Sequence, residues 1–135
     1  MNKHEFIKNF SYLHNWQEKY LYLIELGKSL SPFPEKFKNS NHLVTGCQNL
    51  VWIALLLNRG QIKFYGESNS VIVKGLIAVL FILYKNLKVS ELVLYDINSY
   101  LKRLSLTDHL TPSRMQGLGA IINFIKKSAF FLQKN

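Results

Sequence analysis

The part of the chain most informative about its architecture is LVWIALLLNRGQIKFY, residues 50–65. Residues 50–57 form a continuous apolar run of strand length, and Asn58-Arg59-Gly60 has the composition of a turn. From Gln61 to Tyr65 polar and apolar residues alternate, which is typical of a half-buried strand. Two strands joined by a short turn form a hairpin, and residues 42–44 are expected to add a third, edge strand.

Helical patterns lie on both sides of this hairpin. Before it we expect a helix over 4–13 and another from Asn15 to about Gly27, with Asn15 and Glu18 forming a capping box. After it we expect a loop at 66–70, a long buried helix at 71–84, short helices from Ser90 and over 96–104, and a last helix that begins at Thr111-Pro112. This order predicts an α+β fold in which a small antiparallel sheet of two to three strands packs against helices.

The bulk composition is that of a globular chain. Its 135 residues suit a single domain over 1–135, and 48% of them are apolar while 19% are charged. The most apolar stretch, 71–83, is interrupted by Lys74 and is well short of the roughly 20 residues that cross a bilayer. The first ten residues do not resemble a signal peptide, so we expect a cytoplasmic protein without a membrane partner.

The net charge of +9 raises the question of nucleic-acid binding. Only Arg59, Arg103 and Arg114 are arginines, and the lysines are scattered, with no basic run longer than Lys126-Lys127. No ladder of aromatic residues alternates with the basic ones. We therefore expect no nucleic-acid partner.

Cys47 is the only cysteine, which excludes an intrachain disulfide and a metal or cluster site built from several thiolates. Composition alone leaves it either an inert buried thiol or a reactive one. It follows Gly46 in the segment 45–48, between expected strands, where a loop can present a side chain to a partner. A thiolate there can take a sulfur atom from another sulfur. Without a second cysteine to resolve the persulfide, that sulfur must pass to another protein.

Four blocks of sequence resemble one protein family, in the right order and at compatible spacing. They are NWQEKYLY with ELG in 15–27, VTGCQ with VW in 44–52, GES with IVKGL in 66–76, and LTPSR with QGL in 110–118. On these blocks the chain resembles the SufE family, the sulfur-accepting partners of group II cysteine desulfurases, over almost its whole length.

The resemblance implies a specific function. Family members take sulfane sulfur from a pyridoxal-phosphate-dependent desulfurase of the SufS type onto the acceptor-loop cysteine, here Cys47. They stimulate that enzyme and deliver the sulfur to an iron–sulfur scaffold. The chain would then be no enzyme, would bind no cofactor or metal, and would share a fold that also resembles the scaffold's. Its acceptor loop would rest against the body and move out to the desulfurase, and relatives suggest a homodimer.

Several residues are candidates to support Cys47. Arg114 could direct its permanent positive charge to the thiolate or persulfide, the alternative being a solvated arginine at a helix end. His42 could tune the pKa of the cysteine, although a surface position is the simpler expectation, and His109 is expected to be structural or capping. Gln48 either bonds within the loop or faces solvent.

Two other functions stay open at this stage. A cysteine hydrolase would need His42 or His109 within hydrogen-bond reach of the thiol, and a cluster scaffold would need several ligands around one site. Glu67 stands where many SufE relatives have aspartate, and Asn69 where an acidic residue is common. We expect both in the loop before the central helix, where they bear on release of the acceptor loop.

Overall fold

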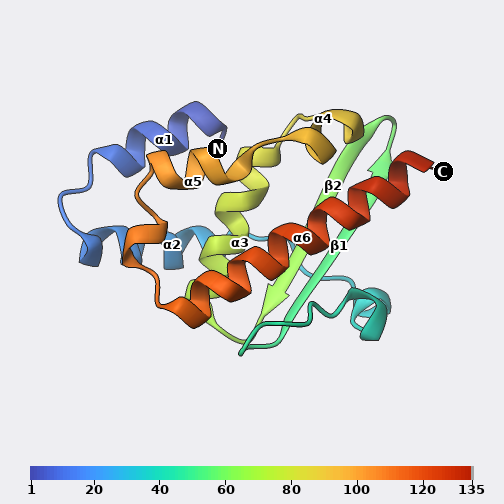
Figure 1. The fold of residues 1–135 in the computed structure, drawn as a ribbon, viewed down its shortest axis with the longest axis horizontal. Helices are drawn as coiled ribbons and strands as arrows, with labels where there is room; N and C mark the ends of the chain where they lie inside the picture. The colour runs from blue at the N-terminus through green and yellow to red at the C-terminus, as the bar shows by residue number, and fades with distance from the viewer. Residues whose placement is uncertain (135) are drawn as a thin grey trace.

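Figure 1 shows a computed structural model of the chain, which describes residues 1–134. Helices precede and follow a two-stranded antiparallel sheet, which confirms the predicted α+β class. The elements are α1 (Lys3–Ser11), α2 (Trp16–Gly27), the 3-10 turns η1 (Glu35–Phe37) and η2 (Ser40–His42), β1 (Val51–Asn58), β2 (Gln61–Ser68), α3 (Val71–Tyr84), α4 (Val89–Leu94), α5 (Ile97–Arg103), the 3-10 turn η3 (Thr107–His109) and α6 (Pro112–Lys134). Among the described residues, no helix combines the length and apolar character needed to cross a membrane.

The hairpin is longer and tighter than the sequence pattern indicated. β1 and β2 pair from Val51 opposite Ser68 to Asn58 opposite Gln61, which leaves a two-residue turn. Both turn residues, Arg59 and Gly60, have positive φ, at 53° and 80°. Such turns match the right-handed twist of the two strands they join. Asn58, predicted in the turn, therefore belongs to β1.

The expected loop at 66–70 is also shorter, because residues 66–68 complete β2. Gly66 is buried within the strand, where an added Cβ would collide with Ile77 and press on Phe81 of α3. A glycine that looks like a loop signal in the sequence is here a point of close packing between strand and helix.

The predicted edge strand at 42–44 is wrong, since only one bridge forms, between Leu43 and Trp52. The turn η2 curls the chain immediately before it. The His42 ring then donates from Nδ1 to the Ile53 carbonyl oxygen, 3.1 Å away. The His42 side chain thus occupies a carbonyl oxygen at the edge of β1, which a third strand would have used for pairing.

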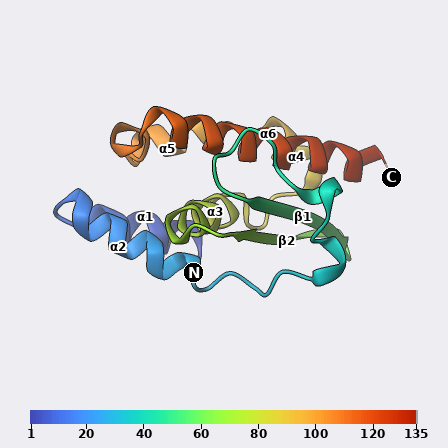
Figure 2. The same cartoon turned by 90° about the horizontal axis from the view of Figure 1, so that it is seen from below.

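α3 is the centre of the core, and Figure 2 shows it between α2 and the hairpin. The Ser70 hydroxyl caps it by accepting from the Val73 N–H at 3.4 Å. Ten of its fourteen residues are buried, which confirms the predicted apolar helix. Where α3 crosses α2, the Gly75 α-carbon lies against the Leu23 backbone and leaves no space for a Cβ.

α6 covers another side of the hairpin, running above it in the view of Figure 2 and packing on β1 and α4. Its buried residues include the five predicted to share one face, namely Leu118, Ile121, Ile122, Ile125 and Ala129. Thr111 is the expected cap, since its Oγ1 accepts from the Arg114 N–H at 3.2 Å. The segment before β1 meets both elements, since Leu43 bridges Trp52 at the edge of β1 and Gly46 lies close to Ala120 of α6.

We expect Gly75→Ala to lower the free energy of unfolding by about 2–3 kcal/mol, because its Cβ would overlap the Leu23 carbonyl and separate two core helices. Gly119→Ala is the matched control: its Cβ would meet nothing within 4 Å. That change should raise the free energy of unfolding by about 0.5–1 kcal/mol, the difference in helix propensity. Urea denaturation measures both, and an unchanged midpoint for Gly75→Ala would contradict the close crossing.

Candidate functional site

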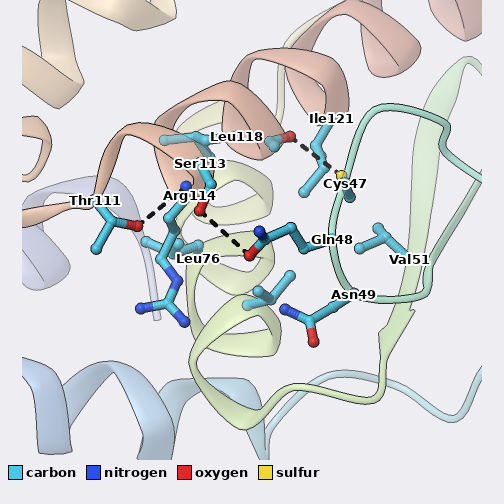
Figure 3. Close-up of a pocket in the computed structure, with 12 residues that line it drawn as sticks. Cys47, Gln48, Asn49, Val51, Leu76, Thr111, Ser113, Arg114, Leu118 and Ile121 are labelled. Carbon is cyan, nitrogen blue, oxygen red and sulfur yellow. Dashed lines mark hydrogen bonds between the residues drawn. The ribbon is translucent and has the colours of Figure 1, made fainter.

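Cys47 lies in a surface loop, residues 45–50, that leads into β1. Thr45, Gly46 and Gln48 are exposed, whereas Cys47 is half-buried. Gly46 has a φ of +95°, a conformation that strains any side chain, and an added Cβ would lie only 3.3 Å from the Ala120 Cβ. The turn at Gly46 lets the loop fold back onto α6, so that the sulfur faces the helix (Figure 3).

The sulfur rests on bare helix backbone. The Cys47 thiol donates to the Gly117 carbonyl oxygen, with 3.4 Å between Sγ and O. Because position 117 has no side chain, the thiol reaches the helix surface; even a Cβ there would lie 3.5 Å from Sγ. A large residue at 117 would occupy the space that the sulfur takes.

Burial raises the pKa of the Cys47 thiol above its ordinary value, because a thiolate in this position would lose contact with water. A thiolate would also have no proton to give to the Gly117 carbonyl and would face the negative end of that dipole. In this position the sulfur is therefore a protonated and poorly nucleophilic thiol.

A cavity of about 310 Å³ opens beside the sulfur (Figure 3). Its apolar wall comes from β1, α3 and α6, and its polar wall from the loop and the first turn of α6. The lining residues are Cys47, Gln48, Asn49, Val51, Val73, Leu76, Thr111, Ser113, Arg114, Gly117, Leu118 and Ile121. Since about 10–15 Å³ of such space is enough for a water molecule, an additional sulfur atom on Cys47 would fit.

The structure brings the predicted supporting residues around Cys47, with one difference. Gly46 shapes the loop, and the Ser113 hydroxyl donates to Gln48 Oε1 at 3.3 Å, so that Gln48 ties the exposed loop to α6. Arg114 lines the cavity, but Figure 3 shows its guanidinium directed away from Cys47. A direct interaction between that charge and the sulfur is not made in this conformation.

Neither candidate histidine lines the cavity. His42 is half-buried, not on the surface as expected, and bonds to the β1 edge. His109 is exposed and stacks on Trp16, with 4.6 Å between ring centroids. A cysteine hydrolase therefore lacks a base at the thiol. Within residues 1–134, no group of three or more His, Cys, Asp or Glu side chains could hold a metal ion, so a cluster scaffold lacks a ligand set there.

The base of the loop is held more firmly than its tip. The Val44 N–H donates to the Val51 carbonyl at 2.8 Å. At the other side, the Leu50 N–H donates to Asn69 Oδ1 at 3.1 Å, while the Asn69 N–H donates to the Leu50 carbonyl at 3.3 Å. The tip relies on the two longer contacts of Cys47 and Gln48. Since a typical hydrogen bond contributes only about 1 kcal/mol, these two contacts hold the tip weakly, and the packing of the half-buried Cys47 against the core adds to them.

Glu67 and Asn69 have different positions, although we expected both in one loop. Asn69 does lie in the connection before α3, and its amide oxygen supplies the acceptor for the loop base. Glu67 instead belongs to β2, where its carboxylate accepts from the Ser68 N–H at 2.9 Å and lies 3.7 Å from the Lys74 ammonium. Glu67 therefore makes its contacts at the end of the sheet and at α3, and not with the Cys47 loop.

Several cavity residues escaped the sequence analysis, above all Val73, Leu76, Ser113 and Gly117. Nothing in local periodicity marks them, because they come from α3 and α6, far along the chain. A signal was nonetheless present, since all four lie within the third and fourth resemblance blocks.

Comparison with known proteins gives a consistent result. A family model described as "SufE: Fe-S metabolism associated domain" matches residues 4–129. The "Cysteine desulfuration protein SufE" of Wigglesworthia glossinidia brevipalpis is 60% identical over 130 residues, which cover 96% of this chain and 90% of that protein. The solution structure of a hypothetical protein from Thermus thermophilus superposes with a TM-score of 0.80 at 16% identity, covering 97% of this chain and 95% of that chain. At that identity it supports the fold alone.

We expect the folded chain to react slowly with iodoacetamide at neutral pH, because only the thiolate reacts and burial raises the pKa of Cys47. The rate should increase with pH, with a midpoint above that of the same chain unfolded in urea. Rates measured by intact mass at several pH values test this. A folded midpoint at or below the unfolded one would contradict the desolvated position of the sulfur.

Gly46→Ala should release the loop, since a residue with a Cβ strains the left-handed backbone by about 1–2 kcal/mol. The displaced conformation would then be about 5–30 times more populated, and alkylation of Cys47 should accelerate by a similar factor. Gly60→Ala is the control, because its φ is +80° but no atom lies within 4 Å of the added Cβ. Equal acceleration in both variants would show global destabilisation instead of local release.

Proposed function

The chain belongs to the SufE family, and from this membership we propose that Cys47 accepts the sulfane sulfur of a cysteine desulfurase and delivers it to iron–sulfur cluster assembly. The observation that carries the proposal is the position of the thiol. It is the chain's sole cysteine, it lies at the weakly held tip of a surface loop, and a cavity beside it has room for one more sulfur.

The transfer is a displacement between sulfur atoms. The Cys47 thiolate attacks the outer sulfur of the desulfurase persulfide, and a new S–S bond forms at Sγ. The original S–S bond breaks, and its electron pair leaves on the desulfurase cysteine as a thiolate. The proton lost by Cys47 balances the proton that the desulfurase thiolate takes up. No oxidant is consumed, because the transferred sulfur keeps its oxidation state.

The raised pKa of Cys47 supports a gated reaction. Against α6 the thiol is protonated and does not attack. When the loop moves out, the sulfur leaves the Gly117 carbonyl, regains contact with water or with donor groups, and ionises more readily. Nucleophilicity would therefore be confined to the displaced state, in which the donor protein is at hand. Return of the loop would bring the loaded sulfur back to the cavity.

In this function the partner desulfurase binds the pyridoxal phosphate, and this chain binds no cofactor. We further propose that the chain stimulates the desulfurase by removing its persulfide, that it acts in the cytoplasm, and that it is an activator rather than an enzyme. A scaffold complex for iron–sulfur clusters is the proposed recipient. The homodimer stays a prediction.

Incubation with the desulfurase and cysteine should add one sulfur to the chain, about 32 Da by intact mass, and reduction with a thiol should remove it. Cys47→Ser should gain no mass and should lose the stimulation of desulfurase turnover. Gln48→Ala is a matched loop variant that keeps the thiol, and it should still accept one sulfur. If Cys47→Ser stimulates the desulfurase as well as the wild type does, Cys47 is not the acceptor.

A further inference from the structure

The rest position of Cys47, against α6, depends on a hydrogen bond in which the reacting sulfur is the donor. The thiol donates its only proton to the Gly117 carbonyl oxygen, with 3.4 Å between Sγ and O. A carbonyl oxygen only accepts, so it binds a sulfur that carries a proton and not one that has lost it. A negatively charged sulfur there would face the negative end of the carbonyl dipole. The rest position therefore favours a neutral thiol.

The cavity beside the sulfur offers little to stabilise a negative charge. β1, α3 and the inner face of α6 contribute apolar side chains to its wall, namely Val51, Val73, Leu76, Leu118 and Ile121. Among the lining residues, all of which the structure describes, Arg114 is the only charged one. Its guanidinium points away from Cys47 in Figure 3. An anion on Cys47 would therefore be uncompensated in this conformation.

The first turn of α6 compensates only weakly, because Thr111 already occupies two of its N–H groups. The Arg114 N–H donates to Thr111 Oγ1 at 3.2 Å, and the Met115 N–H donates to the Thr111 carbonyl at 2.9 Å. Such caps remove donors that would otherwise attract an anion to this end of a helix. The two loop residues that line the cavity beside Cys47, Gln48 and Asn49, are neutral amides.

Transfer of a sulfur atom changes both the proton and the charge of the Cys47 side chain. Sγ becomes bonded to the added sulfur and no longer carries a proton, so it cannot donate to the Gly117 carbonyl. The proton lies on the outer sulfur, and a persulfide is a stronger acid than a thiol because its S–H bond is weaker. In water at neutral pH the loaded side chain is therefore mainly an anion, whereas the thiol is mainly neutral.

The loaded loop is consequently less stable in the rest position than the empty one. Loss of the S–H···O bond lowers the ratio of rested to displaced loop by about fivefold, the effect of one typical hydrogen bond. Burial raises the pKa of the Cys47 thiol and disfavours an ionised persulfide for the same reason. Each pH unit by which the pH exceeds the pKa of the exposed persulfide lowers the ratio about a further tenfold.

We propose that the rest position distinguishes the empty carrier from the loaded one: the Gly117 carbonyl and the apolar cavity retain the neutral thiol and release the persulfide anion. This inference rests on the proposed function and adds a direction to it. An empty loop stays against α6 until it is displaced. A loaded loop that returns to the cavity leaves again more readily and presents its sulfur to the recipient. After delivery, Cys47 takes up a proton and is retained once more.

The test loads the full chain chemically, so its outcome does not depend on a desulfurase. An aromatic disulfide first converts Cys47 to a mixed disulfide. Hydrosulfide then attacks Sγ, the aromatic thiolate leaves with the electron pair of the broken S–S bond, and Cys47–S–SH remains. Because the chain has one cysteine, a single site reacts, and intact mass should show about 32 Da added.

The position of the loop is measured by NMR from the contact between Gly46 and Ala120. An added Cβ at Gly46 would lie 3.3 Å from the Ala120 Cβ, so the Gly46 α-protons should give an NOE to the Ala120 methyl group in the rest position. At about pH 8 the loaded chain should lose about half or more of this NOE intensity relative to the empty chain. At about pH 5 protonation of the persulfide should restore most of it.

Two controls separate the charge from other effects. The empty chain, measured at both pH values, covers the titration of His42 and His109 and should keep its NOE. A chain treated with methyl methanethiosulfonate carries Cys47–S–S–CH3, which adds a sulfur atom and a methyl group but no ionisable proton. It should keep most of the NOE at both pH values, because it loses only the hydrogen bond to Gly117.

An NOE in the loaded chain at the higher pH that equals that of the empty chain overturns the proposal. If Arg114→Gln then removes that NOE, the Arg114 guanidinium holds the persulfide in place instead. Loss of the NOE at both pH values and in the methyl disulfide also overturns the proposal, because size and not charge then displaces the loop. These outcomes leave the proposed function intact, since no desulfurase is used. That function fails separately, if the desulfurase adds no sulfur to Cys47.

Discussion

One face of α6 packs against the core, and the same face also contacts Cys47. The site depends on this shared packing. From Leu118 onward its apolar side chains fill the space against β1 and α4. One position earlier, at Gly117, the helix offers only backbone, and there the sulfur of Cys47 makes its contact. The same packing that closes the core therefore fixes the surface on which the loop rests. A shift of α6 would disturb both together.

Much of the fold follows from patterns in the sequence. The apolar run at 50–57, the alternation from Gln61 and the apolar stretch at 71–84 correctly predicted the hairpin and the buried helix. The errors lie where tertiary contacts override local signals. Gly66 looked like the start of a loop but packs under α3, and residues 42–44 had the composition of a strand while the His42 side chain occupied the β1 edge.

The candidate site was predictable only in part, for a physical reason. Cys47 is recognisable by its uniqueness and its neighbouring glycine, which are local properties. The cavity is not local, since its walls come from the loop, α3 and α6. Three of the four resemblance blocks supply those walls. The remaining block, in α2, lies behind α3 and supports it through the Gly27–Gly75 contact, which keeps the two helices close. The direction of the Arg114 guanidinium could not be inferred from sequence, because it depends on this packing.

The anchored base of the Cys47 loop limits how far the cysteine can move. The Val44–Val51 hydrogen bond fixes the starting point, and Cys47 is three residues beyond Val44. At about 3.5 Å per residue for extended chain, the α-carbon of Cys47 can travel no more than about 10 Å from that anchor without opening the sheet. For the proposed sulfur transfer, this length means that a donor sulfur recessed by more than about 10 Å from the surface that meets the loop base would be out of reach of Cys47.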